Sequence, residues 1–263
     1  MSQKDQLQAL WESHKYTSTA SVSSTEVNHF AIKQLIKYGR DCKSILDLGC
    51  GEGKRLAHLF TGKPILTGID ISRNAITKAQ KKYPSLNFVC GNIEELPFED
   101  ASFSLVYSAF VFEHISNPEV IIKEAFRVLT IGGLMIIIAP NFGAPNRRSP
   151  NSNENKIYKF IAGFIKDINY LLISPTTLNW KRVTPMVSPA DYFIDSDTTT
   201  EPYLLSLIKF CQFMGFKIVE FSSCWPEETT HNFAKKAVKC LGELGVYPFK
   251  YWGPHLFFVV KKV

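Results

Sequence analysis

A predicted buried strand leads directly into a glycine-rich turn near residue 50. The stretch 45–48 is Ile-Leu-Asp-Leu, and glycines follow at positions 49, 51 and 53. Glycine adopts backbone conformations closed to other residues, so a ligand can approach main-chain N–H groups at such a turn. A helix is expected from Lys54 onward, and strand, turn and helix together form the first half of a nucleotide-type binding unit. A chain with this feature is expected to build an α/β fold around a mostly parallel sheet.

Two acidic residues indicate which ligand the turn receives. Asp47 stands two positions before Gly49, where a carboxylate would repel the pyrophosphate of a dinucleotide. S-adenosylmethionine instead carries an ammonium and a sulfonium group, which a carboxylate attracts. Asp70 ends the next predicted strand, 21 positions after Gly49, and a carboxylate near this spacing accepts hydrogen bonds from both ribose hydroxyls. The charges favour S-adenosylmethionine over NAD, so a dehydrogenase is disfavoured.

Five motifs follow one another between residues 25 and 140. They are ILDLGCGEG, GIDIS, FVCGNIEELPF, SLVYSAFVFEHI and EAFRVLTIGGLMIII. In order and spacing they resemble the motifs of class I S-adenosylmethionine-dependent methyltransferases. The Glu-Leu-Pro-Phe and Glu-His elements are similar to the branch that methylates small molecules, including the quinone-biosynthesis C-methyltransferases. The resemblance implies a Rossmann-like, seven-stranded, mostly parallel sheet with an antiparallel edge strand, helices on both faces and a helical lid insertion.

The resemblance also implies cofactor contacts at particular residues of this chain. Asp47 and the three glycines would hold the methionine part, Asp70 the ribose, and Ile71 would lie against the adenine. Tyr16 would close over the methionine carboxylate. Asn92 stands where the family usually has Asp, and its amide oxygen can still accept a hydrogen bond from the adenine amino group. The expected cofactor-binding set is Tyr16, Asp47, Gly49, Gly51, Gly53, Asp70, Ile71, Asn92, Ile93 and Ser108.

Strand and helix patterns alternate along the chain in the βαβ manner. Strands are expected near 44–49, 64–70, 86–90, 103–109, 133–139, 216–223 and 255–262. Helices are expected near 25–39, 53–61, 72–82, 117–129, 202–214 and 230–243. We expect a single domain over residues 1–263, made of an N-terminal lid segment 1–24, a core 25–140 and 201–263, and a substrate-side insertion 141–200.

The insertion is expected to hold the acceptor site, because loops at the carboxyl ends of strands carry the substrate in open α/β sheets. Within it, apolar residues recur at helical spacing between Ile157 and Leu172. The stripe is expected to dock on the main domain, and a lid over the substrate or a membrane-facing surface is the alternative. Asp191, Asp195 and Asp197 are interpreted as loop and capping residues rather than metal ligands, so no metal site is predicted.

His114 is the candidate catalytic residue. It follows the fourth predicted strand at the rim of the expected cofactor cleft, and imidazole titrates near neutral pH. It is expected to act as a base towards an acceptor hydroxyl or acidic carbon, and a structural role in the local turn is the alternative. The transfer itself asks mainly for an in-line arrangement of nucleophile, methyl carbon and sulfur.

The charge, hydrophobicity and cysteine content of the chain bear on nucleic-acid binding, membrane insertion and cellular location. The formal net charge is +6, but the basic residues are scattered as pairs, so no nucleic-acid partner is expected. The first residues lack a basic segment leading into an apolar one, and the longest apolar run, 134–140, is too short to cross a bilayer. No stable membrane insertion is therefore expected. The six cysteines show no paired metal-ligand spacing and are expected to be reduced, as in a cytoplasmic protein.

Two functions from different classes stay open. The first is methyl transfer from S-adenosylmethionine to oxygen or carbon of a small-molecule acceptor, which the aromatic residues of the insertion would suit if the acceptor is apolar or aromatic. The second is a protein that binds S-adenosylmethionine or S-adenosylhomocysteine in a regulatory or non-methylating role. The complete set of acidic residues and glycines favours the first. The sequence indicates neither the acceptor and its attacked atom nor the oligomeric state.

Overall fold

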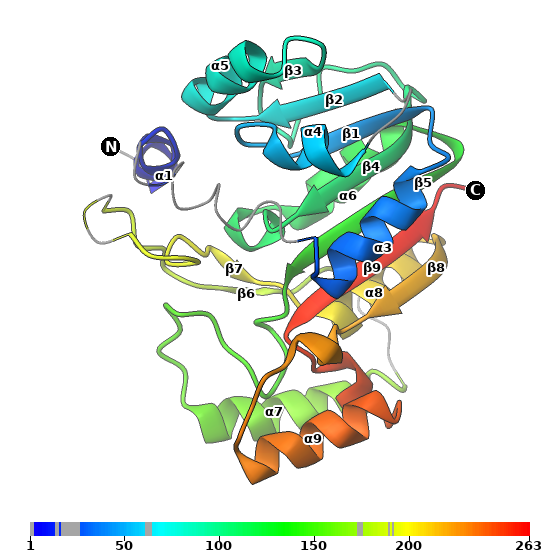
Figure 1. The fold of residues 1–263 in the computed structure, drawn as a ribbon. Coiled ribbons are helices and arrows are strands. Elements are labelled where there is room, and N and C mark those ends of the chain that lie inside the picture. Colours follow the sequence, from blue (N-terminus) through cyan, green and yellow to red (C-terminus); the bar gives the residue numbers. More distant parts are fainter. Residues whose placement is uncertain are drawn as a thin grey trace.

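A seven-stranded sheet forms the centre of the protein (Figure 1). The computed structural model describes residues 3–13, 16, 27–60, 65–172, 176–188, 190 and 192–263. Strands β1 to β5 run parallel, whereas β9 runs antiparallel between β5 and β8. The predicted mostly parallel sheet with an antiparallel edge is confirmed. In sheet order the strands are β3 (Asn87–Cys90), β2 (Ile65–Asp70), β1 (Ser44–Leu48), β4 (Phe103–Ala109), β5 (Leu129–Pro140), β9 (His255–Lys261) and β8 (Lys217–Ser222).

Helices cover both faces of this sheet. On one face lie α3 (Phe30–Gly39), α4 (Lys54–Leu59) and α5 (Arg73–Lys82), and on the other α6 (Pro118–Val128) and α8 (Leu204–Phe213). Successive side chains of a strand point to opposite faces. In β5, Ile136 and Ile138 accordingly pack with the first group of helices, whereas Met135 and Ile137 pack with the second. Both faces are buried, as a mostly parallel sheet requires.

The strand order reverses beside β1. Strands β2 and β3 lie on one side of it, and β4 and β5 lie on the other. In open α/β sheets the crevice at such a reversal, beyond the carboxyl ends of the strands, is where ligands bind. The topology therefore places a ligand site after Leu48, after Asp70 and after Ala109, where β1, β2 and β4 end.

The helix predicted in the insertion is present as α7 (Lys156–Asn169), but most of its apolar stripe faces outward. The side chains of Ile157, Ile161 and Ile165 are 72%, 53% and 56% exposed. Phe164 is the member of the stripe that is partly buried against the core, with its ring 6.2 Å from that of Trp252. The expectation that the stripe as a whole docks on the main domain is wrong.

Polar contacts anchor α7 from its other side. The carboxylate of Asp167 is fully buried and accepts hydrogen bonds from the Tyr203 hydroxyl and, at 2.7 Å, from the Trp252 indole N–H. Lys159 Nζ lies 2.5 Å from Oε2 of the buried Glu201. Buried polar groups of this kind require partners, and here the partners lie in the segment just before α8 and in the C-terminal region. Residue spacing within the helix could not reveal them.

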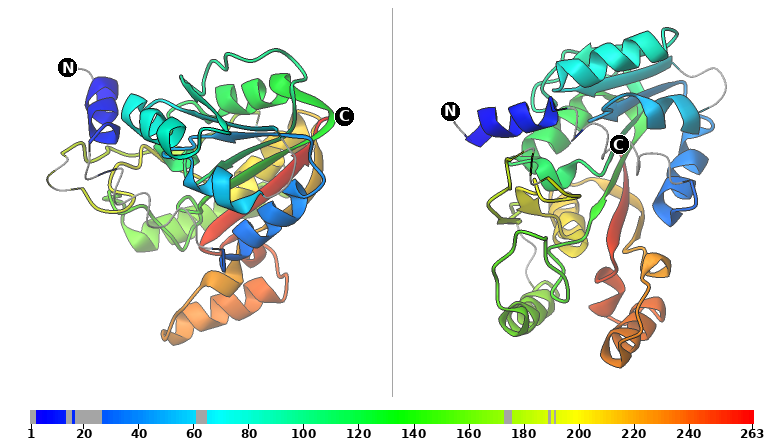
Figure 2. Two further views of the ribbon diagram at one scale, coloured as in Figure 1. Left: turned by 45° about the horizontal axis from the view of Figure 1, so that its top comes forward. Right: turned by 60° about the vertical axis from the view of Figure 1, so that its left-hand side comes forward.

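The remaining elements lie at the two ends of the molecule. Figures 1 and 2 show α7 and α9 (Phe233–Glu243) at one end, away from α1 (Gln3–Trp11), which lies near α5. The helix α1 was not predicted as such, although its residues belong to the expected lid segment. Within the described ranges, no helix is both long enough and apolar enough to cross a membrane. A two-stranded sheet, β6 (Lys181–Arg182) and β7 (Thr200–Glu201), and three short 3-10 helices, Phe112–His114, Trp225–Glu227 and Phe249–Tyr251, complete the fold.

Candidate functional site

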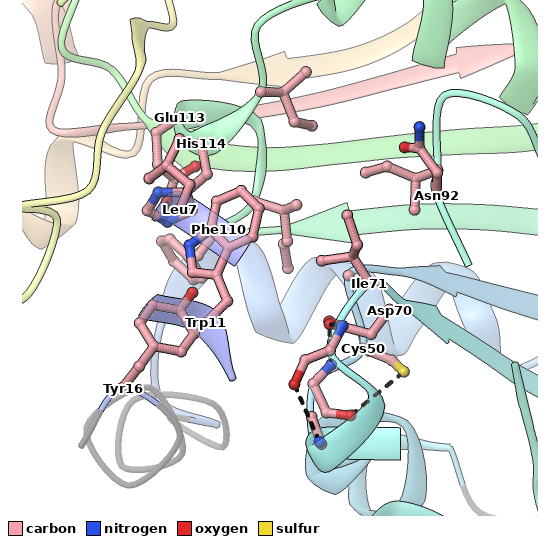
Figure 3. A pocket seen from close by; sticks show the side chains of 18 of the residues that line it. Leu7, Trp11, Tyr16, Cys50, Asp70, Ile71, Asn92, Phe110, Glu113 and His114 are labelled. Atoms are coloured by element: carbon pink, nitrogen blue, oxygen red, sulfur yellow. Dashed lines mark hydrogen bonds and ion pairs between the residues drawn. The ribbon is translucent and has the colours of Figure 1, made fainter. Parts of the chain in front are cut away.

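A cavity of about 390 Å³ opens at the carboxyl ends of β1, β2 and β4. The glycine turn and the segments after β2 and β3 form one side, and α1 with the segment after β4 forms the other. Figure 3 shows Trp11, Tyr16 and His114 on one side, with Asp70 and Asn92 opposite. The structure thus brings the N-terminal segment and the motif residues together around one space.

The three glycines of the turn all have positive φ, but they have different surroundings. Their φ values are 78° at Gly49, 53° at Gly51 and 71° at Gly53. An added Cβ would lie 2.5 Å from a Val111 methyl at Gly49 and 2.4 Å from the Phe88 ring at Gly53. At Gly51 nothing lies within 4 Å of that position. Gly51 therefore keeps the wall open, and Gly53, which does not line the cavity, serves packing.

Asp70 is fixed at the edge of the cavity by the backbone. Its Oδ2 accepts a hydrogen bond from the Gly51 N–H at 2.8 Å, and its Oδ1 accepts one from the Ser72 N–H at 2.9 Å. Burial raises the pKa of Asp70, while the hydrogen bonds from Ser72 and Gly51 oppose the rise. A carboxylate held in this way has lone pairs left to accept two further hydrogen bonds from a ligand. Ile71 lies next to it on the cavity wall.

Asp47 and Ser108 lie behind the wall rather than on it. Asp47 is fully buried, and its Oδ2 accepts a 2.6 Å hydrogen bond from the Tyr107 hydroxyl. Burial raises the pKa of Asp47 to about 6, although the nearby guanidinium of Arg55 lowers it. Ser108 donates to the Leu48 carbonyl at 3.2 Å. Neither side chain touches the cavity, so their expected direct contacts with the cofactor stay predictions.

Asn92 and Ile93 line the side of the cavity that follows β3. Oδ1 of Asn92 accepts a 3.0 Å hydrogen bond from the Glu94 N–H, which fixes the side chain. An amide oxygen has two lone pairs, so a second donor can still bind to it. The position agrees with the expected contact to an adenine amino group, and that contact stays a prediction.

The N-terminal helix closes the cavity from outside. Leu7, Trp11 and Tyr16 line it, and the Tyr16 ring lies 5.1 Å from that of Tyr192 in the insertion. Glu12 anchors the helix, because its carboxylate accepts hydrogen bonds from the first backbone N–H groups of α5 and from the Ser72 hydroxyl. The sequence prediction missed Trp11 and Glu12. The available signal was Leu7, Leu10 and Trp11 at helical spacing.

An acidic cluster surrounds His114 on the wall that follows β4. His114 Nδ1 lies 3.2 Å from Oδ2 of Asp197, and Nε2 lies 3.7 Å from Oε1 of Glu113. Burial alone would lower the pKa of His114, but the carboxylates of Asp197, Glu113 and Asp195 outweigh it and raise the pKa. Burial raises the pKa of Glu113 to about 8. Within reach of three carboxylates, the imidazole is better suited to binding a cation or holding a proton than to acting as a free base.

Part of the chain is similar in sequence to a known protein family and to proteins of assigned function. Residues 46–137 match the family described as "Methyltransferase domain". A protein assigned as an S-adenosylmethionine-dependent methyltransferase in Mycolicibacterium smegmatis is 29% identical over 124 residues, 46% of this chain and 48% of the relative. A Bacillus subtilis protein assigned as a 23S rRNA (guanine-N1)-methyltransferase is 35% identical over 120 residues, 43% of this chain and 40% of the relative. Demethylmenaquinone methyltransferase of Chlamydia pneumoniae is 28% identical over 148 residues, 55% of this chain and 64% of the relative. The matched regions span 40% to 64% of the length of these relatives.

Solved structures agree on the fold over most of the chain. A Listeria monocytogenes protein assigned as an S-adenosylmethionine-dependent methyltransferase has a TM-score of 0.57 at 18% identity, covering 88% of this chain and 95% of the other. The [4+2]-cyclase SpnF has a TM-score of 0.52 at 17% identity, covering 88% and 80%. Residues 46–137 are thus a methyltransferase domain, and the fold over most of the chain matches that of class I S-adenosylmethionine-dependent methyltransferases, whose cofactor is S-adenosylmethionine.

Proposed function

We propose that this protein transfers the methyl group of S-adenosylmethionine to a small-molecule acceptor. The observation that carries the proposal is the carboxylate of Asp70, held by the backbone of Gly51 and Ser72 at the edge of the cavity. A fixed acidic acceptor beside an open glycine turn suits a ribose with two hydroxyls. In the displacement, the acceptor's oxygen or carbon attacks the methyl carbon. The carbon–sulfur bond breaks, and its electron pair goes to sulfur, leaving S-adenosylhomocysteine.

The cover that α1 and the insertion give the cavity supports a small acceptor. The helix α1 covers one side, and Tyr192, Ile194 and Asp195 of the insertion line the acceptor-facing wall. Walls on two sides can place the nucleophile in line with the methyl group, and such positioning can supply about 7–11 kcal/mol of rate enhancement. The menaquinone-methylating relative methylates a small molecule, whereas the relative assigned to 23S rRNA does not. The covered cavity favours the former class for this chain.

The alternative is a protein that binds the cofactor without transferring its methyl group. The [4+2]-cyclase shows that another chemistry exists on this fold. Under that alternative, the protein would bind the cofactor, but no candidate acceptor would gain a labelled methyl group.

Calorimetry of S-adenosylhomocysteine binding tests the cofactor site. We expect Asp70→Ala to weaken binding by at least about tenfold, since two charge-assisted hydrogen bonds are worth about 1.5–3 kcal/mol each. The matched control is Asp41→Ala, an exposed acid far from the cavity, which should bind as the wild type does. Equal affinities for the wild type and Asp70→Ala would contradict the proposed site.

A second experiment tests the acceptor class. It compares the transfer of a labelled methyl group to quinol and phenol acceptors with its transfer to ribosomal RNA.

A further inference from the structure

We infer that Glu113, His114 and Asp195 bind a divalent transition-metal ion at the acceptor end of the cavity. One ligand atom from each residue can be chosen so that all three lie within 4.8 Å of one another. All three side chains also line the cavity. An imidazole nitrogen with two carboxylate oxygens suits Zn²⁺ or Mn²⁺ better than Mg²⁺ or Ca²⁺, which prefer oxygen alone.

The buried atoms of Glu113 independently indicate a missing partner. Its side chain is 1% exposed, and neither Oε1 nor Oε2 has a hydrogen-bond partner in the described part of the chain. Oδ1 of Asp197, also fully buried, lacks one as well. Among the described residues no lysine or arginine forms an ion pair with Glu113, Asp195 or Asp197. Buried carboxylates without donors are costly, and a bound cation is one of the few groups that can satisfy several of them at once.

Hydrogen bonds hold the two segments that supply the ligands together. The Thr199 N–H donates to the Glu113 carbonyl at 2.8 Å, and the Thr200 hydroxyl donates to the Ile115 carbonyl at 3.1 Å. The loop carrying Asp195 is therefore fixed against the short helix carrying Glu113 and His114. Ligands on a rigid framework bind a metal without a large ordering cost.

The neighbours of His114 indicate which nitrogen faces the metal. Nδ1 lies 3.2 Å from Asp197, and Nε2 faces Glu113. A metal-binding histidine usually donates its other N–H to a carboxylate, which fixes the ring. Asp197 lies beside Nδ1 without forming a hydrogen bond to it, and the Trp11 indole N–H donates to Asp197 Oδ2 at 2.8 Å. We therefore assign Nε2, which faces Glu113, as the ligating atom, with Asp197 placed to hold the ring once Nδ1 donates to it.

The inference rests on the proposed methyl transfer and narrows its acceptor class. A metal on the cavity wall has coordination positions open to the substrate, and it lowers the pKa of a bound hydroxyl. The hydroxyl proton then leaves to water, the oxygen attacks the methyl carbon, and the carbon–sulfur bond breaks towards sulfur. The acceptor is therefore an alcohol, phenol or enol, and His114 serves it as a ligand of the metal instead of as a free base.

Metal binding can be measured without any acceptor. The full chain, stripped by a chelator, is titrated with Mn²⁺ while the free-ion signal is followed by electron paramagnetic resonance, and with Zn²⁺ by calorimetry. We expect one bound ion per chain, with affinity lowered at least about tenfold in Glu113→Gln and in Asp195→Asn. The control is Asp41→Asn, which should bind the ion as the wild type does. Because Asp195 is only partly buried, its variant keeps the test valid if Glu113→Gln fails to fold.

Each outcome separates this inference from the proposed function. No binding of either ion, or equal binding by the wild type and both ligand variants, would overturn the metal site. S-adenosylhomocysteine binding is measured on the same samples. Cofactor binding without metal binding would support the proposed function and overturn the metal site. Metal binding without cofactor binding would support the metal site and overturn the proposed function.

Discussion

Oε1 of Glu12 accepts a 2.7 Å hydrogen bond from the backbone N–H of Arg73, the first residue of α5. The first N–H groups of a helix have no partner within the helix. Ser72 satisfies one of them in the usual way, through its hydroxyl and the Ala75 N–H. Glu12 satisfies two more from a segment about 60 residues away in the chain. The same contact thus caps α5 and holds α1 over the cavity.

Replacing Glu12 should loosen both elements. We expect Glu12→Ala to lower the free energy of unfolding by about 1 kcal/mol, as for the loss of a capping side chain. Hydrogen exchange in α1 should also become faster than in the wild type. Denaturant unfolding and hydrogen-exchange mass spectrometry would measure the two effects. Glu99→Ala, at an exposed acid outside the cavity, is the control, and an unchanged exchange rate in α1 would show that Glu12 does not anchor it.

The glycines of the turn should differ in their response to alanine. Gly53→Ala places a methyl group against the Phe88 ring at a positive φ, so we expect a stability loss of about 2–4 kcal/mol from strain and crowding. Gly51→Ala meets open space, so only the backbone cost of about 1–2 kcal/mol applies. Its methyl group projects from the cavity wall, so cofactor affinity should fall more than stability does. Thermal unfolding would measure the stability of both variants, and calorimetry would measure their cofactor affinity. Equal stability losses would contradict the packing role of Gly53 and the cavity-wall role of Gly51.

The buried carboxylate of Asp167 should make stability depend on pH. Burial raises its pKa from the ordinary 3.8 to about 6, although hydrogen bonds from Tyr203 and Trp252 oppose the rise. Between pH 3.8 and about 6 the folded protein therefore binds this proton more tightly than the unfolded chain, so stability falls as pH rises through that window. About two pKa units correspond to about 3 kcal/mol.

Asp167→Asn keeps the shape of the side chain and removes this titration. Denaturant unfolding from pH 4 to pH 8 should show the variant gaining stability over the wild type as pH rises, with the gain complete near pH 7. A pH-independent difference between the two proteins would mean that Asp167 does not titrate in this way.

The outer face of α7 should tolerate polar residues. Ile161 and Ile165 are more than half exposed, and exposed substitutions usually change stability by less than about 0.5 kcal/mol. We expect Ile161→Gln and Ile165→Gln to unfold like the wild type. Phe164→Ala, which removes a ring packed against Trp252, should cost about 2–4 kcal/mol. Urea unfolding of the three variants would test the orientation of the helix. Larger stability losses in the two isoleucine variants than in Phe164→Ala would refute this orientation.

Local patterns predicted the elements that depend on neighbouring residues. The strand ending at Leu48, the turn with Gly51 and the acid at Asp70 follow from hydrophobic runs and glycine spacing, and the structure places the turn and Asp70 at the cavity. The seven-stranded, mostly parallel sheet and its antiparallel strand followed from the family resemblance, and both are confirmed.

What escaped prediction depends on partners distant in sequence. Asp47 bonds to Tyr107, and Glu12 bonds to the start of α5, each over about 60 residues. The apolar stripe on α7 was expected to be buried because apolar residues usually are. Instead, Asp167 and Lys159 form buried polar contacts on the side of α7 away from its exposed face. Spacing within one helix predicts a helix. It does not show which face will meet the rest of the protein.

The place of β9 in the sheet has a consequence for synthesis. This strand lies between β5 and β8 and pairs with both, although it leaves the ribosome after both of them. Until His255–Lys261 emerges, β5 keeps an unpaired inner edge and β8 has no neighbour, and open strand edges invite wrong pairing. The cofactor half of the sheet, β1 to β4, can assemble while translation continues, but the core closes only after His255–Lys261 has emerged.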